Sequence, residues 1–369
     1  MYAIKVDLNP KYTAERYCRF YPTLKIVDKK CYYELFETGD VDNNIIDKFR
    51  IRKEFFTPFQ GYLDYVYGLV SVDNSSYLPE LENILGGKIN NINALIQDEV
   101  PKCLTVPKIW GIINTTPDSF SDGGLNNNLN DAFSTVEKMI EYGIDVLDIG
   151  GESTRPGSEE VSAQEEIDRV LPLIEKLVSS YKACSISIDT TKSEVAEAAL
   201  KNGASIINDI SGGIFDTKIF DTAIKYDAEI SLMHILGKPK NMQHDPQYIN
   251  VTLEVIAHLI RQTEIAKSKG VKKIIIDPGI GFGKTISHNY ELLHRISEFS
   301  AIGLPVLIGV SRKNFIGKSL NLGITERDNA TSMIEMYAAG KGVSHIRTHN
   351  YKLAAQLKQI NKYINYPHD

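Results

Sequence analysis

Residues 109 to 124 read IWGIINTTPDSFSDGG, and this stretch decides the fold. Ile109 to Ile113 are predicted to form a buried strand, and at Asn114 the chain changes into a loop of hydroxyls, carboxylates, proline and glycine. A strand that ends this way is typical of the carboxyl end of a parallel barrel, where catalytic loops gather. Taken alone, the loop is better explained as an ordinary solvated connection. The junctions that follow along the chain favour the barrel.

Seven further segments repeat the order of apolar strand, polar tip and helix. They are DVLDIGGESTRPGS (145–158), CSISIDTTKSE (184–194), ASIINDISGG (204–213), EISLMHILG (229–237), KKIIIDPGIGFGKT (272–285), PVLIGVSRKNF (305–315) and VSHIRTHN (343–350). The pattern between them predicts helices over 129–142, 162–180, 247–269 and 351–363, and Thr190 to Ser193 are able to cap another.

Eight strands separated by helices predict a parallel sheet with right-handed crossovers, because parallel neighbours need a long connection. We therefore expect an α/β protein with a (β/α)8 TIM barrel over residues 106–369. A doubly wound open sheet is the alternative, but it usually has about six strands and one ligand-binding switch point. Residues 1–105 show strand patterns at 1–8 and 31–39 and a helical pattern at 77–87, so we expect a small α+β N-terminal domain of unknown role.

Composition excludes several classes of protein. The 369 residues are 43% hydrophobic and 24% charged with a net charge of −6, which is typical of a globular protein and unlike a nucleic-acid binder. The four cysteines, Cys18, Cys31, Cys103 and Cys184, lack the spacing of a zinc site or a disulfide framework, so we expect free thiols. The sequence has neither an apolar run of membrane-spanning length nor a signal-peptide pattern, and we expect a cytoplasmic protein.

The glycine-rich segment DPGIGFGKT resembles two nucleotide motifs and matches neither. A phosphate-binding loop of the Walker type requires glycine at the position of Pro278, and the dinucleotide fingerprint requires a different spacing from that of Gly279, Gly281 and Gly283. What remains is a carboxylate at a strand end, Asp277, beside a loop that lets a flat ligand approach the backbone.

Charged and amide side chains are predicted to meet at the carboxyl end of the barrel. Arg347 and His349 lie two residues apart on a predicted strand, so they face the same side and, with Asn114, could clamp a phosphate or pyrophosphate. A surface arginine with a capping histidine is the alternative. Four acidic or amide residues are predicted at the ends of the neighbouring strands, namely Asp148, Asp189, Asn208 and Asp277. Together they would repel one another unless their charge is neutralised. A ligand rich in N–H donors would neutralise them, and Lys313 would help.

These segments together resemble the dihydropteroate synthase family of pterin-binding TIM barrels. The resemblance covers roughly residues 108–365 and rests on NTTPDSFSDGG (114–124), GGESTRPGS (150–158), SIDTTK (187–192), NDISGG (208–213), DPGIGFGK (277–284), SRKNFIG (311–317) and IRTH (346–349). It implies a transferase of folate biosynthesis that condenses hydroxymethyl-dihydropterin pyrophosphate with p-aminobenzoate and releases pyrophosphate. The N-terminal segment is left unexplained, and it shows none of the motifs of a pterin pyrophosphokinase.

The resemblance also implies roles for individual residues. Asp189, Asn208, Asp277 and Lys313 would hold the pterin, with Met233 and Phe282 beside it. Asn114, Arg347 and His349 would hold pyrophosphate, with Mg²⁺ on Asn114. Asp118, Phe120, Thr154, Arg155 and Pro156 would shape the p-aminobenzoate pocket from two loops that close as lids, and Asn314 would lie near its carboxylate. Ser311 is a further expected substrate-binding residue. The residues expected to act in catalysis are Lys313, Asp189, Arg347, His349 and Asp118.

Three residues depart from the family pattern. Thr115 replaces an apolar residue, Asn314 replaces serine, and Asn350 follows His349 where aspartate is usual. Because asparagine can cap a helix as serine does, we expect Asn314 to keep the carboxylate site. The loss of a carboxylate at Asn350 could change the orientation or charge of His349.

Two other functions compete with this one. A pterin-binding methyltransferase domain shares the barrel and the pterin contacts but needs neither the pyrophosphate clamp nor the two loops. A non-catalytic barrel is disfavoured, because it has no physical need to keep clustered charges that destabilise the fold. The partners expected are the two small-molecule substrates and a second copy of the chain in a homodimer, with no nucleic acid and no membrane.

Overall fold

The computed structural model describes two parts of the chain. In the N-terminal part it describes the strand residues 2–6, 30–36, 59–60 and 66–73, and in the remainder it describes residues 106–115, 125–154, 157–181, 184–248 and 250–366. Contacts divide the chain into two compact units, one consisting mainly of residues 1–101 and the other of most of the remaining chain. Each unit is described separately below.

The N-terminal strands form an antiparallel sheet in the order β1-β2-β4-β3. Their bounds are Tyr2–Val6 for β1, Lys30–Phe36 for β2, Phe59–Gln60 for β3 and Val66–Asp73 for β4. The first two confirm the strands predicted there, and β3 and β4 are strands that the sequence analysis missed. The helix predicted over 77–87 lies outside the described residues.

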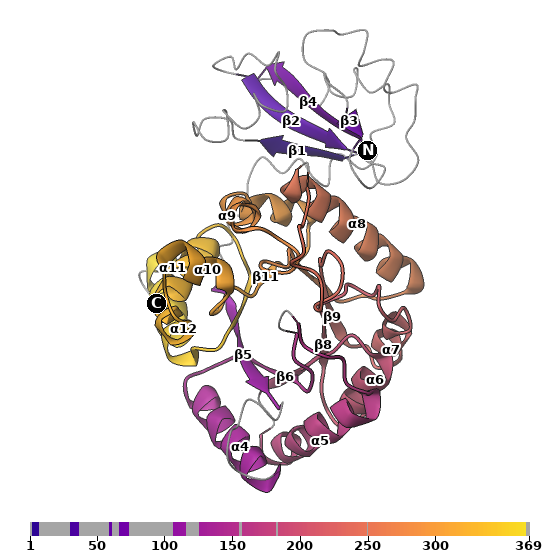
Figure 1. Ribbon diagram of the computed structural model, residues 1–369, viewed down its shortest axis with the longest axis vertical. Helices are drawn as coiled ribbons and strands as arrows, with labels where there is room; N and C mark the ends of the chain where they lie inside the picture. The colour runs from indigo at the N-terminus through magenta and orange to yellow at the C-terminus, as the bar shows by residue number, and fades with distance from the viewer. Residues whose placement is uncertain are drawn as a thin grey trace. The chain divides into compact units, whose positions relative to one another are not determined.

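The second unit is a parallel barrel (Figure 1). Its strands are β5 (Lys108–Asn114), β6 (Val146–Gly150), β7 (Ser185–Asp189), β8 (Ile206–Asp209), β9 (Glu229–Met233), β10 (Ile274–Asp277), β11 (Leu307–Ile308) and β12 (His345–Thr348). Each strand pairs in parallel with its neighbour in the order β10-β9-β8-β7-β6-β5-β12-β11. A parallel bridge between Ile276 and Val306 joins β10 to the chain entering β11 and so closes the ring. The predicted TIM barrel is confirmed.

Helices surround these strands. They are α4 (Leu125–Glu141), α5 (Ala163–Ser180), α6 (Ser193–Lys201), α7 (Ile219–Lys225), α8 (Val251–Lys269), α9 (Ile286–His294), α10 (Asn314–Leu320), α11 (Asp328–Ala339) and α12 (Tyr351–Asn365), with 3-10 turns η3 (Ile296–Ile302) and η4 (Ile324–Glu326). The four predicted helices agree with α4, α5, α8 and α12 to within four residues at each end. No helix in the described part of the chain is long and apolar enough to cross a membrane. The cytoplasmic location stays a prediction.

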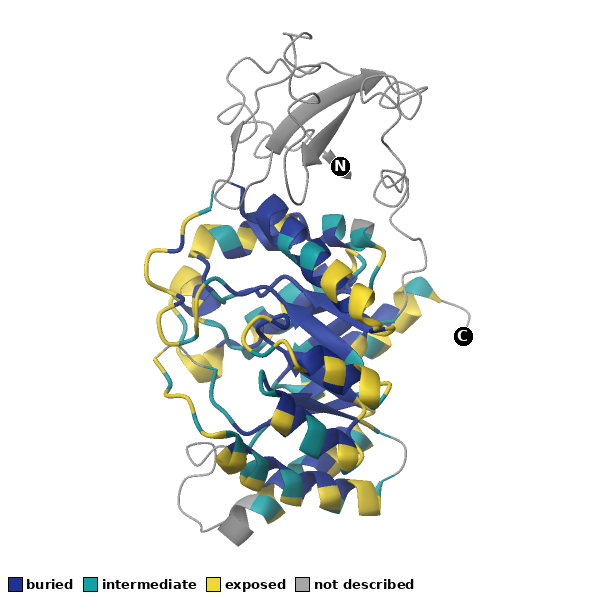
Figure 2. Cartoon of the chain, turned by 90° about the vertical axis from the view of Figure 1, so that its right-hand side faces the viewer, coloured by how far each residue is buried: buried dark blue, intermediate teal, exposed yellow. Residues whose placement is uncertain are grey.

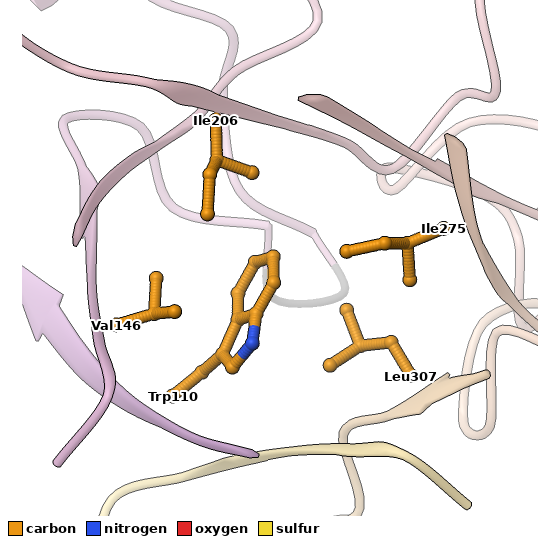
Figure 3. Packing of buried hydrophobic residues seen from close by; sticks show 5 residues of the cluster. All are labelled: Trp110, Val146, Ile206, Ile275 and Leu307. Atoms are coloured by element: carbon orange, nitrogen blue, oxygen red, sulfur yellow. The ribbon is translucent and has the colours of Figure 1, made fainter. Parts of the chain in front are cut away.

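The barrel interior is packed with side chains from alternate positions of the strands, as the two-residue period of a strand requires. Trp110, Val146, Ile206, Ile275 and Leu307 come from five strands and form one buried cluster around the indole ring (Figure 3). Figure 2 shows the strands buried and the outer faces of the helices exposed. This cluster fills the interior below the strand ends, so the polar side chains above it lie on a rigid base.

The start of α6 corrects a local prediction. Its N-cap residue is Lys192, which makes no side-chain capping bond, and Thr190 instead accepts a hydrogen bond from the Lys192 N–H at 3.2 Å. The N–H of Ser193 is satisfied by Asp216 at 2.8 Å, from the loop that precedes α7. The acceptor comes from a neighbouring βα unit, and the sequence around α6 therefore could not reveal it.

Candidate active site

Polar side chains gather at the carboxyl ends of the barrel strands, and most of them are buried. Asp148 on β6 is 0% exposed, and three others at strand ends are less than a tenth exposed, namely Asp189, Asn208 and Asp277. Register places Asp189 directly opposite Asn208, and Asn208 Nδ2 donates to Asp148 Oδ2 at 3.2 Å. The structure thus confirms that Asp148, Asp189 and Asn208 meet at one end of the barrel.

Arg347 neutralises two of the carboxylates. Its Nε donates to Asp148 Oδ2 and its Nη2 donates to Asp189 Oδ2, each at 2.5 Å. Charge-assisted bonds of this length are among the strongest side-chain interactions. The sequence analysis grouped Arg347 with the phosphate clamp and looked to Lys313 for neutralisation, and it therefore missed this pairing.

Burial and charge shift the pKa values of these groups. Burial raises the pKa of Asp189 to about 7, while Arg347 acts to lower it. Burial also raises the pKa of Asp277, against the opposing charge of Lys313. For Lys313, burial lowers the pKa to about 7, although Asp277 favours its charged form. A buried cluster of groups with strongly shifted pKa values is typical of an active site.

The glycine-rich loop after β10 contacts both Asp277, the last residue of that strand, and Lys313. Asp277 Oδ1 accepts a hydrogen bond from the Gly279 N–H at 2.7 Å. Lys313 Nζ donates to the carbonyl oxygen of Ile280 and lies 4.4 Å from the centroid of the Phe282 ring. Phe282 also packs against the apolar cluster that contains Met233. Predicted pterin residues from three strand ends are therefore brought together.

The segment after β11 has an unusual backbone conformation. Arg312 has a φ of 57°, in the left-handed region that non-glycine residues seldom adopt. Its guanidinium group makes two bonds to Asp328 at 2.6 and 2.8 Å, and its N–H donates to Thr331 Oγ1 at 3.2 Å. These contacts come from α11 and hold the turn that presents Lys313 on one side and Ser311 on the other.

Ser311 positions His349. The His349 backbone N–H donates to Ser311 Oγ at 3.1 Å, and His349 Nδ1 lies 3.0 Å from the same oxygen. Strand β12 ends at Thr348, so His349 lies just beyond the strand on which it was predicted. A contact from the neighbouring strand end therefore helps to fix the orientation of the ring.

Several predicted residues lie outside the described part of the chain, namely Asp118, Phe120, Arg155 and Pro156. Thr154 and Asn114 are described and are both partly exposed. At the base of the loop that contains Thr154, Lys192 Nζ binds Glu152 and also donates to the buried Glu166 at 2.6 Å. This ion-pair cluster ties the start of the loop to α5 and to the N-terminus of α6.

Comparison with known proteins agrees with this geometry. The family model described as "Pterin binding enzyme" matches residues 110–349. The dihydropteroate synthase of Escherichia coli (strain K12) is 42% identical over 259 residues, which are 70% of this chain and 91% of that protein. The chain belongs to the dihydropteroate synthase family. Its N-terminal unit lies outside the region matched by the family model.

Two solved structures of the family share the barrel. The dihydropteroate synthase of Yersinia pestis with a sulfonamide drug complex aligns with a TM-score of 0.67 at 39% identity and covers 71% of this chain and 95% of its own. The enzyme from Xanthomonas albilineans in complex with 7,8-dihydropteroate aligns with a TM-score of 0.64 at 33% identity, with coverage of 71% and 95%.

The departures from the family pattern each have a defined contact. Thr115 Oγ1 donates to the Gly150 carbonyl at 3.1 Å and so links β5 to β6. Asn350 caps α12 by accepting from the Leu353 N–H at 3.1 Å, and its Nδ2 donates to Asp328 Oδ2 at 2.9 Å. An amide at position 350 can therefore do what a carboxylate cannot, because it both accepts from the helix and donates to Asp328.

Asn314 is not the cap of α10, although its expected role was argued from the capping ability of asparagine. The N-cap residue of α10 is Lys313, and Asn314 is the first residue of the helix. Its Oδ1 accepts from Arg327 Nη1 at 3.0 Å. The side chain thus joins the contacts around Arg312 and does not cap the helix. Its predicted role near the substrate carboxylate stays a prediction.

Proposed function

We propose that the chain catalyses the reaction of its family: 6-hydroxymethyl-7,8-dihydropterin pyrophosphate and p-aminobenzoate condense to 7,8-dihydropteroate and pyrophosphate. The observation that carries this proposal is the buried set of acceptors, Asp189, Asn208 and Asp277, at the barrel end beside Lys313. A pterin ring presents several N–H donors on one edge, and buried carboxylate and amide groups match such donors. The Xanthomonas relative in complex with 7,8-dihydropteroate supports the same assignment.

In this proposal Asp277 and Asp189 hold the pterin. The one bond from Gly279 to Asp277 Oδ1 leaves this carboxylate further lone pairs for a ring N–H and an amino group. Asn208, opposite Asp189, supplies an amide that both donates and accepts. Lys313, above the Phe282 ring, closes one face of the pocket, and Met233 belongs to the apolar cluster beneath that ring.

Arg347 and His349 hold the leaving pyrophosphate. The Nε and Nη2 atoms of Arg347 donate to the two carboxylates. The third nitrogen, Nη1, donates to none of the residues that the structure describes. We therefore expect Nη1 to donate to a phosphate oxygen. If Ser311 donates its hydroxyl hydrogen to His349 Nδ1, the imidazole proton lies on Nε2 and can be donated to an anion.

Asn114 fits the role of a single protein ligand to Mg²⁺. It lies at the end of β5, is partly exposed, and its amide oxygen has no hydrogen-bond partner within the described ranges. No cluster of three or more acidic, histidine or cysteine side chains suited to a metal is found among the described residues. A cation that keeps water and phosphate ligands needs only one such oxygen. When bound, Mg²⁺ would neutralise charge on the pyrophosphate.

The chemistry requires no nucleophilic side chain. As the C–O bond to pyrophosphate breaks, its electron pair leaves with pyrophosphate and positive charge develops on the pterin methylene carbon. The amine nitrogen of p-aminobenzoate forms the new C–N bond to this carbon and releases one proton. The carboxylates Asp189 and Asp277 lie where they can stabilise that charge, and the donors of Arg347 and His349 stabilise the departing anion. The loops that carry Asp118, Phe120, Thr154, Arg155 and Pro156 would exclude water, and Asn314 would lie near the carboxylate of p-aminobenzoate.

The test is release of pyrophosphate from purified protein with pterin pyrophosphate, p-aminobenzoate and Mg²⁺. Release should require both substrates and should fall at least a hundredfold in Asp189→Asn, since a preorganised charge is lost. Asp221→Asn is the matched control, because this aspartate is 67% exposed on α7. No pyrophosphate from the native protein would refute the proposal. Methyl transfer to a corrinoid would instead support a pterin-dependent methyltransferase.

The proposal includes a homodimer. Helices α11 and α12 lie side by side (Figure 1) and expose large apolar side chains; these are Met333 (73%), Tyr337 (43%), Ile360 (51%), Tyr363 (56%) and Ile364 (65%). Exposed apolar groups on neighbouring helices are typical of a protein interface. Light scattering should give twice the monomer mass for the native protein and the monomer mass for Met333→Glu with Ile364→Glu.

A further inference from the structure

Lys284 is a buried lysine without a role in the proposed chemistry. It ends the glycine-rich loop and is 3% exposed. Its Nζ donates to the carbonyl oxygens of Gly279 at 2.9 Å and Phe282 at 3.0 Å, and it lies 3.0 Å from His234 Nδ1. A buried amine needs partners for its N–H groups, and here two of them belong to its own loop.

Side chains bind a run of backbone carbonyls in the loop around Lys284. Four consecutive carbonyls, from Gly279 to Phe282, each accept a hydrogen bond from a side chain. Two bind Lys284, that of Ile280 binds Lys313, and that of Gly281 accepts from Gln243 Nε2 at 2.6 Å. Lys284 is the buried anchor among these, whereas Gln243 approaches from the exposed side.

The loop lies very close to the chain that follows β9. A Cβ atom on Gly279 would lie 1.8 Å from the His234 carbonyl oxygen, and one on Gly283 would lie 2.7 Å from that of Leu236. Lys284 reaches across this contact to the His234 ring. Burial lowers the pKa of Lys284, but both its charged and its neutral form can donate to the two loop carbonyls.

Lys313 rests on the part of the loop that Lys284 holds. The Ile280 carbonyl that binds Lys313 lies between the two carbonyls bound by Lys284, and the Phe282 ring lies beneath Lys313 Nζ. A Cβ atom on Gly281 would lie 2.7 Å from Lys313 Cδ. Any movement of the loop must therefore move Lys313 or break its contacts.

We infer that Lys284 is a positioning residue for the pterin pocket: it fixes the glycine-rich loop so that Ile280 and Phe282 hold Lys313 in place. This inference rests on the proposed function, because Lys313 is assigned to the pterin there. It is specific, because none of the contacts proposed for p-aminobenzoate lies on the glycine-rich loop. Loss of the anchor should weaken use of the pterin substrate more than use of p-aminobenzoate.

Steady-state kinetics of Lys284→Met test this. The KM for pterin pyrophosphate should rise about tenfold, as expected when buried acceptors lose their donor, while the KM for p-aminobenzoate should change less than about twofold. Gln243→Ala is the matched control, since water can replace its exposed contact with the same loop. An unchanged pterin KM in a folded Lys284→Met protein, or an equal rise in both constants, would overturn the inference.

A double-mutant cycle tests the route of the effect. Calorimetry of pterin pyrophosphate binding should show that Lys284→Met costs about tenfold in affinity in the native background and less than about twofold in Lys313→Ala. Independent, additive losses would contradict the inference. Gly281→Ala places a methyl group between the loop and Lys313 and leaves Lys284 unchanged. A normal KM for pterin pyrophosphate in this variant would also overturn the inference, whether or not Lys284→Met folds.

The two proposals fail differently. Absence of pyrophosphate release by the native protein refutes the proposed function. An active native protein whose folded loop variants keep a normal pterin KM refutes only the positioning role of Lys284.

Discussion

Replacing Arg347 with methionine should destabilise the barrel, and the size of the effect should depend on pH. The change removes both bonds to Asp148, which is 0% exposed, and to Asp189, which is 8% exposed, each 2.5 Å long. Removing one partner of a buried ion pair typically costs about 3–5 kcal/mol, because the remaining charge is left buried and unpaired. We expect a loss of this size in the free energy of unfolding at pH 8.5.

The pH dependence follows from Asp189. Its pKa in the folded protein is about 7, raised by burial and lowered by Arg347. When the pKa of a carboxyl group is higher in the folded than in the unfolded protein, its contribution to stability is fully present below the pKa of the unfolded protein. That contribution is lost as the pH rises through the pKa of the folded protein. Without Arg347 the folded pKa rises further, so more stability is lost between pH 7 and the new pKa. At pH 6 Asp189 is mostly protonated in both proteins, and its share of the penalty should be small.

The assay is urea unfolding followed by the fluorescence of Trp110, the only tryptophan in the sequence, which is 0% exposed inside the barrel. The loss in Arg347→Met should be at least about 1.4 kcal/mol greater at pH 8.5 than at pH 6, the equivalent of one pKa unit. Lys225→Met, which removes an exposed pair with Glu197, should cost less than about 1 kcal/mol at either pH. A loss below 1 kcal/mol at pH 8.5, or one that is equal at the two pH values, would refute this reasoning.

Three further outcomes are expected. Asn350→Asp should lower stability by about 1–2 kcal/mol at pH 8, because a second carboxylate replaces the donor to Asp328. Parallel denaturant titrations should show a smaller loss at pH 4. Gly279→Ala should lower stability by roughly 2–4 kcal/mol, because its Cβ atom would lie 1.8 Å from the His234 carbonyl oxygen. Gly143 has a φ of 73° and open space around it, so Gly143→Ala should show only the backbone cost of about 1 kcal/mol. In calorimetry p-aminobenzoate should bind well only after pyrophosphate has been added, because the family resemblance implies that loops closing over pyrophosphate form part of its pocket; equally tight binding to the free protein would contradict this.

Local patterns were enough to predict the barrel. Each strand is a short apolar run that ends at a polar residue, and each helix has its own periodicity, so the eight units could be recognised one at a time. The strand ends predicted at Asp189, at Asn208 and Asp209, and at Asp277 were correct, whereas β6 continues past Asp148 to Gly150. The meeting of several of them follows from topology alone, because parallel strands bring their carboxyl ends together.

The pairing of charges could not be predicted in the same way. Arg347 and Asp148 are separated by 199 residues, and their contact depends on the register between β12, β5 and β6 when the barrel closes. No sequence spacing encodes that register. For the same reason the sequence showed Lys284 only as part of a glycine-rich motif and gave no sign that it lies against His234.

The departures at Asn314 and Asn350 show why single positions mislead. Compared with the family pattern one at a time, they look like two independent losses of a side-chain function. In the structure Asn314 binds Arg327 and Asn350 binds Asp328, two consecutive residues at the start of α11. Both of these residues bind Arg312. Arg327 Nη1 donates to the carbonyl oxygen of Arg312 at 2.9 Å, and Asp328 binds the guanidinium group of Arg312.

The two asparagines therefore belong to one network, and its centre is the left-handed turn that presents Lys313. A strained φ at Arg312 persists only because its surroundings hold it in place. Here the N–H, the carbonyl and the side chain of Arg312 are each bound by a residue of α11 or of the position before it. Substitution of one member, such as Asn350 or Asp328, should therefore affect the direction of Lys313 even though neither residue is proposed to contact substrate. Contacts between side chains, more than the identity of either asparagine, determine whether the site is preserved.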